Sequence, residues 1–246
     1  MPVHKISARF FGSLNVEWPC PACAQKTLVI DKESFQAKSL LKCRQAQDEG
    51  DFEPEMDETV FSCMAHCSRA NCNEVVVCIG KGGWQEEWDD EMRKRGYVTW
   101  YEPMSFTPTL HPFALPGKCP DEITGPLTAS FSVYLSQPGS AANLIRIAVE
   151  RMLTAIGVPE HNDKRKRINL HQRIELLDGQ YTPYKNTLMA IKFLGNAGSH
   201  TYDEVSTVDI EAAFEIMQYV VNDLFSGRKE SIEILTRRLH SKFGNQ

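Results

Sequence analysis

The stretch Cys20-Pro-Ala-Cys23, matched much later in the chain by Cys67-Ser-Arg-Ala-Asn-Cys72, decides the fold of the first half of this sequence. Two cysteines across a tight turn form a knuckle whose backbone N–H groups can point at the sulfurs. Four thiolates suit tetrahedral zinc, with Zn–S distances of about 2.3 Å. The spacing therefore predicts one structural Zn2+ held by Cys20, Cys23, Cys67 and Cys72, with each knuckle on a hairpin of a small zinc ribbon.

Other donors lie close enough in sequence to be alternative ligands. Cys63 and His66 precede Cys67, and Cys63-x3-Cys67 is a second candidate pair. We prefer Cys72 because a strand pattern, residues 74–79, follows it directly, as it does in zinc ribbons. Free buried cysteines are the remaining interpretation. A set of four cysteines closes the coordination sphere, so we expect the zinc to stabilise the fold and not to catalyse a reaction.

Composition agrees with a metal-binding protein of the cytoplasm. All of the eight cysteines except Cys119 lie between positions 20 and 78, whereas a disulfide scaffold is usually short and secreted. No apolar run approaches the roughly 18 residues that span a bilayer, and no secretory signal is evident. We therefore expect a cytoplasmic protein without membrane contact. The net charge of −5 argues against nonspecific coating of nucleic acid but allows a local basic patch.

The residue patterns divide the chain into two parts and predict an α+β protein. Residues 1–105 are expected to form the zinc-ribbon region, with strands at 27–30 and 74–79. The acidic segment 45–58 is interpreted as a solvated loop inserted between the knuckles, or as a mimic of nucleic-acid charge. Residues 86–95 resemble one charged helix face or turn. Prolines in 106–120 indicate an extended connector.

Residues 106–246 carry apolar side chains at helical spacing and predict an antiparallel α-helical bundle. The apolar stripes run through 123–134, 141–156, 170–177, 182–191, 210–224 and 232–239. Ser206 and Asp209 form a candidate capping box at the start of the clearest helix.

Polar residues of this half supply the remaining candidates. Arg146 and Glu150 lie one turn apart, which by default is a surface pair. The basic run 164–167 is either a solvated loop or a phosphate contact. In Ile191-Lys-Phe-Leu-Gly-Asn-Ala-Gly-Ser-His200, Gly195 and Gly198 allow a close backbone approach.

Four stretches of this half resemble a bacterial family, domain of unknown function 4145. They are Cys119-Pro-Asp-Glu-Ile, the helix Ala141-Ala-Asn-Leu-Ile-Arg-Ile-Ala-Val-Glu150, His171-Gln-Arg-Ile-Glu-Leu-Leu, and the stretch 191–200. The resemblance covers about residues 105–240 and is specific only in combination. That group is similar to the HEPN superfamily of helical bundles, whose members commonly form homodimers. Many are RNases of toxin, RNA-processing and anti-phage systems.

The resemblance also implies candidate site residues. The HEPN motif is an arginine, usually followed by a polar residue, with a histidine four to six positions after the arginine. Asn196 and His200 match the polar residue and the histidine, Gly195 stands where the arginine would be, and Lys192 lies one turn earlier. We therefore expect a non-catalytic module that binds nucleic acid or protein through Arg146, Glu150, Asn196 and His200, in phage defence or stress response. The alternatives are a metal-independent RNase using His200, with Asn196 and Lys192, and a structural adaptor.

Overall fold

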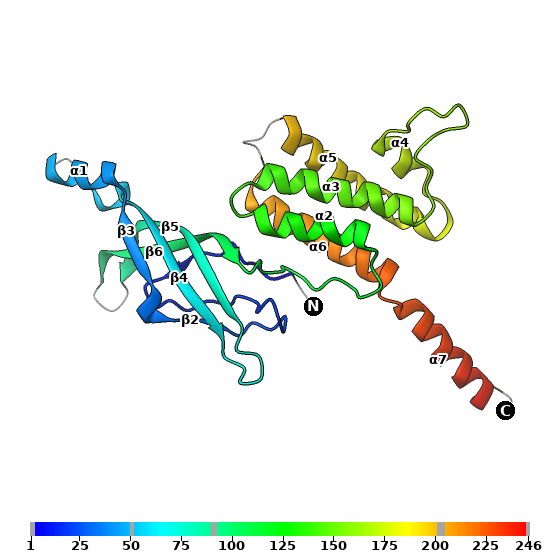
Figure 1. Ribbon diagram of the computed structural model, residues 1–246, viewed down its shortest axis with the longest axis horizontal. Helices are drawn as coiled ribbons and strands as arrows, with labels where there is room; N and C mark the ends of the chain where they lie inside the picture. Colours follow the sequence, from blue (N-terminus) through cyan, green and yellow to red (C-terminus); the bar gives the residue numbers. More distant parts are fainter. Residues whose placement is uncertain (1–2, 50–51, 90–92, 201–204, 245–246) are drawn as a thin grey trace. The chain divides into compact units, whose positions relative to one another are not determined.

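The computed structural model describes residues 3–49, 52–89, 93–200 and 205–244, and it is an α+β protein with its strands in the first half and its long helices in the second (Figure 1). The chain contacts define two compact units. The sheet unit contains residues 4–112 and 131–137, and the helical unit contains 1–3, 113–130 and 138–246. The placement of the boundary at residue 106 stays a prediction. Among the described residues, no helix combines the length and apolarity that a membrane span requires.

The sheet unit is built around one curled antiparallel sheet. Its strands are β1 (Phe10–Phe11), β2 (Leu28–Ile30), β3 (Gln36–Ser39), β4 (Glu58–Cys67), β5 (Val75–Asp89) and β6 (Lys94–Thr107). They follow the order β1-β6-β5-β4-β2, and β3 also pairs with β4. Both expected strands are present, but the second is much longer than residues 74–79. A six-stranded sheet is larger than the small ribbon that the cysteine spacing predicted.

One face of the sheet covers an aromatic core. Strand β4 alternates strictly, with Phe61, Cys63, Ala65 and Cys67 buried and the residues between them turned outward. Rings from separate strands and loops meet over this face, with centroid distances of 4.8 to 5.6 Å between neighbours. The cluster consists of Phe10, Trp18, Phe35, Phe61, Tyr101 and Phe106.

Two charged segments of the first half fold differently from the sequence-based expectation. The acidic segment was expected to be a loop, but its first residues belong to helix α1 (Leu41–Glu49), and the short 3-10 helix η2 (Pro54–Met56) follows. Asp57 is buried and accepts hydrogen bonds from Trp84 Nε1 at 3.1 Å and Ser39 Oγ at 3.0 Å. A carboxylate held this way is part of the core, because a buried charge needs such partners.

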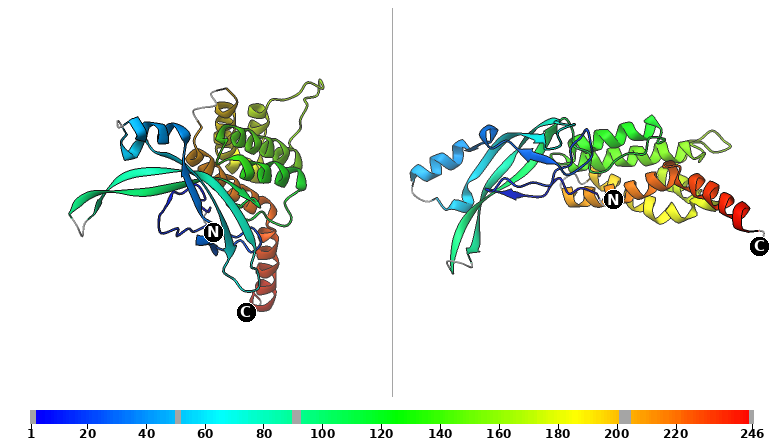
Figure 2. Two further views of the ribbon diagram at one scale, coloured as in Figure 1. Left: turned by 60° about the vertical axis from the view of Figure 1, so that its left-hand side comes forward. Right: turned by 90° about the horizontal axis from the view of Figure 1, so that it is seen from below.

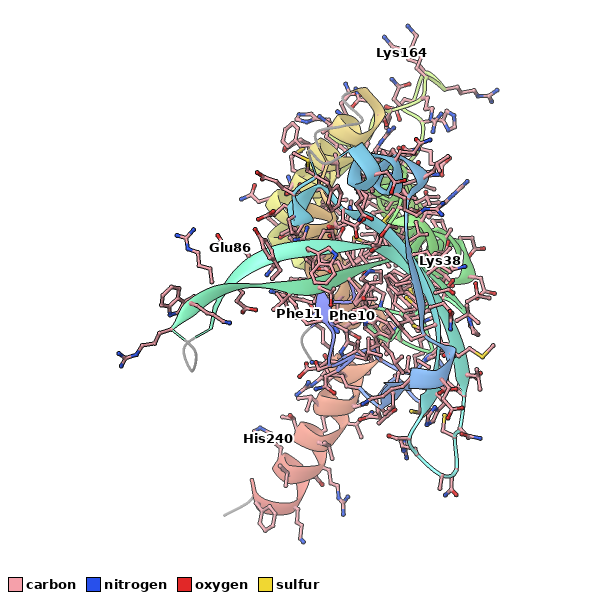
Figure 3. The ribbon with its side chains drawn as sticks, turned by 90° about the vertical axis from the view of Figure 1, so that its left-hand side faces the viewer. Phe10, Phe11, Lys38, Glu86, Lys164 and His240 are labelled. Carbon is pink, nitrogen blue, oxygen red and sulfur yellow. The ribbon has the colours of Figure 1, made fainter. Side chains whose placement is uncertain are left out.

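The expected charged helix or turn at residues 86–95 is instead part of the β5–β6 hairpin. Glu86 pairs in register with Tyr97, and Arg95 Nη1 lies 3.0 Å from Glu86 Oε2. Figure 3 marks Glu86 on the outer part of this hairpin. The residues 90–92 between the strands lie outside the described part of the chain. Cross-strand ion pairing explains why opposite charges are concentrated in a segment that is not a helix.

The helical unit follows the apolar stripes closely. The helices of the second half of the chain are α2 (Asp121–Val133), α3 (Pro138–Ala155), α4 (Leu170–Glu175), η3 (Gly179–Tyr184), α5 (Lys185–His200), α6 (Thr207–Phe225) and α7 (Arg228–Phe243). The short helix η1 (Lys32–Ser34) belongs to the sheet unit. The capping box of Ser206 and Asp209 is confirmed, with both reciprocal hydrogen bonds present. Helix α7 differs from the others because none of its described residues is buried.

Helices α3 and α5 lie side by side and run in opposite directions (Figure 2). Gly195 faces Arg146, and Gly198, one turn further along α5, faces Gly139 and Ala142, earlier in α3. A Cβ atom added at position 198 would lie 2.5 Å from the Gly139 carbonyl oxygen. The two glycines predicted to allow a close approach therefore allow one between helices.

Candidate functional site

The first knuckle is a tight turn locked by two backbone hydrogen bonds. The Ala24 N–H donates to the Cys20 carbonyl, and the Cys20 N–H donates to the Gln25 carbonyl, both at 2.8 Å. Ala24 takes a left-handed backbone conformation with φ of 54°. This turn folds Cys23 back toward Cys20, so both sulfurs face the same side.

The second knuckle repeats this arrangement with a longer turn. The Cys67 N–H donates to the Glu74 carbonyl at 2.8 Å, and Asn73 supplies the left-handed residue with φ of 49°. Strand register brings the two knuckles together, because Leu28 of β2 pairs with Cys67 at the end of β4. The site is therefore positioned by the sheet as well as by the turns.

The two knuckles bring four sulfurs into one cluster. The ligand atoms of Cys20, Cys23, Cys67 and Cys72 all lie within 4.8 Å of one another. The Sγ atoms of Cys20 and Cys72 are 3.6 Å apart, and those of Cys23 and Cys67 are 3.8 Å apart. A tetrahedron of sulfurs about 2.3 Å from zinc has edges of about 3.8 Å. The cluster thus has the donor type and the dimensions to hold a metal ion.

The surroundings of the sulfurs favour thiolates at part of the cluster. The Gln25 N–H donates to Cys23 and lowers the pKa of that thiol to about 6. The Thr27 hydroxyl lies 3.1 Å from the Cys67 sulfur and lowers the pKa of Cys67. Burial raises the pKa of Cys20 to about 12. A metal ion supplies the positive charge that would offset this burial cost, because thiolates are the form that binds zinc.

The alternative ligands lie away from this cluster. Cys63 is four residues before Cys67 on an extended strand, which separates their Cα atoms by about 13 Å. Cys63 is buried opposite Cys78 in register, and His66 is exposed on the other face of β4. Cys43 instead bonds within the core, where its sulfur accepts from the Glu58 N–H at 3.2 Å. Among the described residues, the predicted four cysteines are the one group of three or more side chains placed to hold a metal ion together.

The candidate residues of the helical unit are only partly brought together. Arg146 Nη2 lies 3.2 Å from Glu150 Oε1, and Arg167 Nη2 lies 3.6 Å from Glu150 Oε2. The aliphatic part of the Arg146 side chain packs against Gly195, and a Cβ atom added to Gly195 would be 2.7 Å from the Arg146 Cβ. Its guanidinium pairs with Glu150, which lies further along α3. Because α3 and α5 are antiparallel, this pairing turns the charge away from the end of α5.

Of the other predicted residues of α5, Lys192 and Asn196 have described side chains. Asn196 is half-buried, and the Lys192 ammonium lies 4.3 Å from the ring centroid of its neighbour Phe193. His200 ends α5, but its side chain lies outside the described part of the chain, as do residues 201–204. The prediction that Asn196 and His200 form a binding surface therefore remains a prediction.

Arg173, a buried residue of α4, was not among the residues predicted from the sequence. Its guanidinium donates to the Glu150 carbonyl at 3.1 Å, the Thr154 hydroxyl at 2.9 Å and the Val158 carbonyl at 3.0 Å. The periodicity could have revealed this, because Arg173 is three residues after Leu170 and next to Ile174 on the inward face of α4. A charged residue on the apolar stripe of a helix is a signal of burial.

The chain is thus an α+β protein of two units, a sheet unit that contains the four-cysteine cluster and a helical unit. Comparison with family models gives two matches, one for each part. Residues 9–111 match the domain of unknown function DUF8608. Residues 128–242 match the domain of unknown function DUF4145, which confirms the resemblance predicted for the helical half. No curated protein and no solved structure matches the chain. The zinc-ribbon and HEPN-like assignments stay predictions.

Proposed function

We propose that this chain is a zinc-binding interaction protein, in which zinc stabilises the sheet unit and the helical unit binds a partner without cleaving it. The observation that carries the metal part is the convergence of four cysteine sulfurs within 4.8 Å. Their separations fit tetrahedral zinc, and an all-thiolate set leaves no open position for substrate. Zinc at this place ties the loop before β2 to the end of β4.

The helical unit favours binding over catalysis for a steric reason. The ribonuclease motif needs an arginine beside the polar residue Asn196, but position 195 is pressed against Arg146 and has no room even for a Cβ atom. Charge accumulates on the phosphate during RNA cleavage and needs a fixed cation close by. Arg146 is paired with Glu150, and Lys192 lacks the bidentate fork of an arginine. Catalysis through His200 is therefore the weaker alternative.

The family resemblance supplies the wider context of this proposal. Homodimerisation, a nucleic-acid or protein partner, a bacterial source and a role in phage defence or stress response all rest on it, whereas the cytoplasmic location is proposed from the composition. A structural adaptor is the second alternative. It differs from the leading proposal in using only the sheet unit to hold its partner.

Metal content tests the zinc proposal directly. We expect about one zinc per chain in gently purified protein, and loss of zinc together with solubility in Cys72→Ser. Cys43→Ser is the matched control, because this buried cysteine lies outside the cluster. Zinc-free wild-type protein would refute the proposal. Loss of zinc in Cys63→Ser but not in Cys72→Ser would refute the ligand assignment.

Incubation with total RNA in EDTA tests the absence of catalysis. We expect no appreciable cleavage by the wild type, and weaker partner binding or dimerisation in Asn196→Ala and His200→Ala. Brisk cleavage that disappears in His200→Ala would establish the RNase alternative. If both variants associate as the wild type does, the stretch 195–200 serves only to pack α5 on α3.

A further inference from the structure

The helical unit contains a cavity of about 500 Å3 that neither the metal proposal nor the α5 residues use. It lies between the second half of α3, the loop that follows it and the start of α4. Arg146, Arg151, Arg167 and Arg173 line it, together with Glu150 and Glu160. Its volume lies within the range of about 300–1,000 Å3 that is usual for small-molecule sites.

The charge of the cavity is positive and only partly compensated. Four arginines and two carboxylates give its lining a formal charge of +2. Glu150 is shared between Arg146 and Arg167, while the Glu160 carboxylate accepts from the Thr154 hydroxyl at 2.7 Å. The Arg151 side chain is exposed at the cavity. A concave surface with this excess of guanidinium groups attracts anions.

Arg173 has a fixed position in the wall of this cavity. Its side chain is 5% exposed, and three hydrogen bonds to α3 and the following loop fix its orientation. Its Nε is buried and has no hydrogen-bond partner among the described residues. The positive charge of Arg173 is thus held at the wall of the cavity, where it favours the binding of an anion.

The remaining walls of the cavity are apolar. Ile147, Ile168 and Leu170 line it beside the arginines. Arginine forks bind the oxygens of phosphate in pairs, and apolar walls suit the organic group that carries the phosphate. A dianion also matches the formal charge of the lining.

We propose that this cavity binds the phosphate group of a small phosphate monoester, with the charge of Arg173 fixed at its wall and with Arg146, Arg151 and Arg167 closing on the phosphate oxygens. Arg146 and Arg167 already meet at Glu150, so a small change of rotamer transfers them to a ligand. The loop that brings Arg167 to the cavity carries Lys164 and Arg165 at its outer end, and Figure 3 shows Lys164 pointing away from the helices. The proposal does not depend on zinc or on the residues of α5.

Calorimetric titration of the full chain tests this inference with three probes, adenosine 5′-monophosphate, inorganic phosphate and adenosine. We expect the monophosphate to bind most tightly, inorganic phosphate more weakly and adenosine not measurably. Arg151→Gln and Arg167→Gln alter exposed side chains and should each raise Kd by about tenfold, which is the size of one charge-assisted contact. Arg173→Gln, which removes the fixed charge, should also raise Kd, and its circular dichroism spectrum checks that it is folded.

Lys164→Gln is the matched control, because it removes the same charge from the same loop outside the cavity. It should leave Kd unchanged. An equal loss of affinity in Lys164→Gln and Arg167→Gln would show diffuse attraction and overturn the proposal. Absence of monophosphate binding at millimolar concentration would overturn it as well. A short RNA that binds through Arg151 and Arg167 more tightly than the monophosphate would replace the small-molecule ligand with a nucleic acid.

Discussion

Gly198 should be required for the packing of α5 on α3, and Gly198→Ala tests this requirement. The added Cβ would lie 2.5 Å from the Gly139 carbonyl oxygen and 2.9 Å from the Ala142 Cβ. The nearer of these atoms belongs to the backbone, so a side-chain rotation cannot relieve the contact. The two helices would have to move apart, which would loosen the packing around Ile145 and Ile191, both buried.

The expected loss of stability combines two opposing effects. Overpacking a tight contact costs about 1–3 kcal/mol. Alanine has the higher helix propensity and returns about 1 kcal/mol. The net loss of up to about 2 kcal/mol corresponds to a decrease in Tm of up to about 8 °C. Ala190, exposed on the same helix, provides the matched comparison, because there only propensity acts.

Urea denaturation followed by circular dichroism at 222 nm measures both variants. Ala190→Gly should lose about 1 kcal/mol, which shows that alanine is preferred at a position without a close neighbour. Gly198→Ala should also lose stability, which shows that glycine is preferred where the helices touch. A Gly198→Ala protein more stable than the wild type would refute the packing explanation. The glycine would then have to serve another purpose, such as the approach of a ligand.

Three further predictions concern other parts of the chain. Chelation of zinc should lower the Tm of the protein and expose the thiols of the cluster to a thiol reagent, and it should do the same in Cys43→Ser, whose substituted side chain lies outside the cluster. Trp84→Phe should cost about 1–3 kcal/mol in urea denaturation, because it leaves the buried Asp57 with one donor fewer. Trp88→Phe, at a more exposed site of the same strand, should cost less. Hydrogen bonds from Tyr184 and Lys229 lower the pKa of Asp223. A carboxyl group whose pKa is lowered on folding stabilises the protein at pH values above its ordinary pKa of about 4, and this stability is lost as the pH falls through the pKa of the folded protein. Asp223→Asn should therefore destabilise the protein at pH 7 and have little effect at pH 2.

The helical half could be predicted from the sequence because each helix presents one apolar stripe. Ile123, Leu127 and Phe131 are buried at the spacing that the pattern requires, and the capping box marks the start of α6 correctly. The four cysteines could be predicted for a different reason. Metal knuckles are local turns, so short spacings within the chain carry their geometry.

The sheet could not be predicted to its full extent, because its signals are not local. Strand β5 contains Gly80, Gly82 and Gly83, which interrupt the apolar pattern but fit against Phe61, Trp100 and Tyr101 of neighbouring strands. The outer half of the β5–β6 hairpin is charged and therefore resembled a helix face. Arg173 was overlooked because its bonding partners lie far from it in sequence, in α3 and the loop after it.

Helix α7 has a consequence for the dynamics of the protein. It spans Arg228–Phe243 and buries no side chain within the described chain, with Leu239 and Phe243 both more than half exposed. A helix of about this length is marginal in water when packing does not support it. Its amide hydrogens should therefore exchange with deuterated solvent through local opening, far faster than those of α3 or α6. Denaturant that weakens the core should leave this exchange almost unchanged, because α7 opens without the rest of the fold.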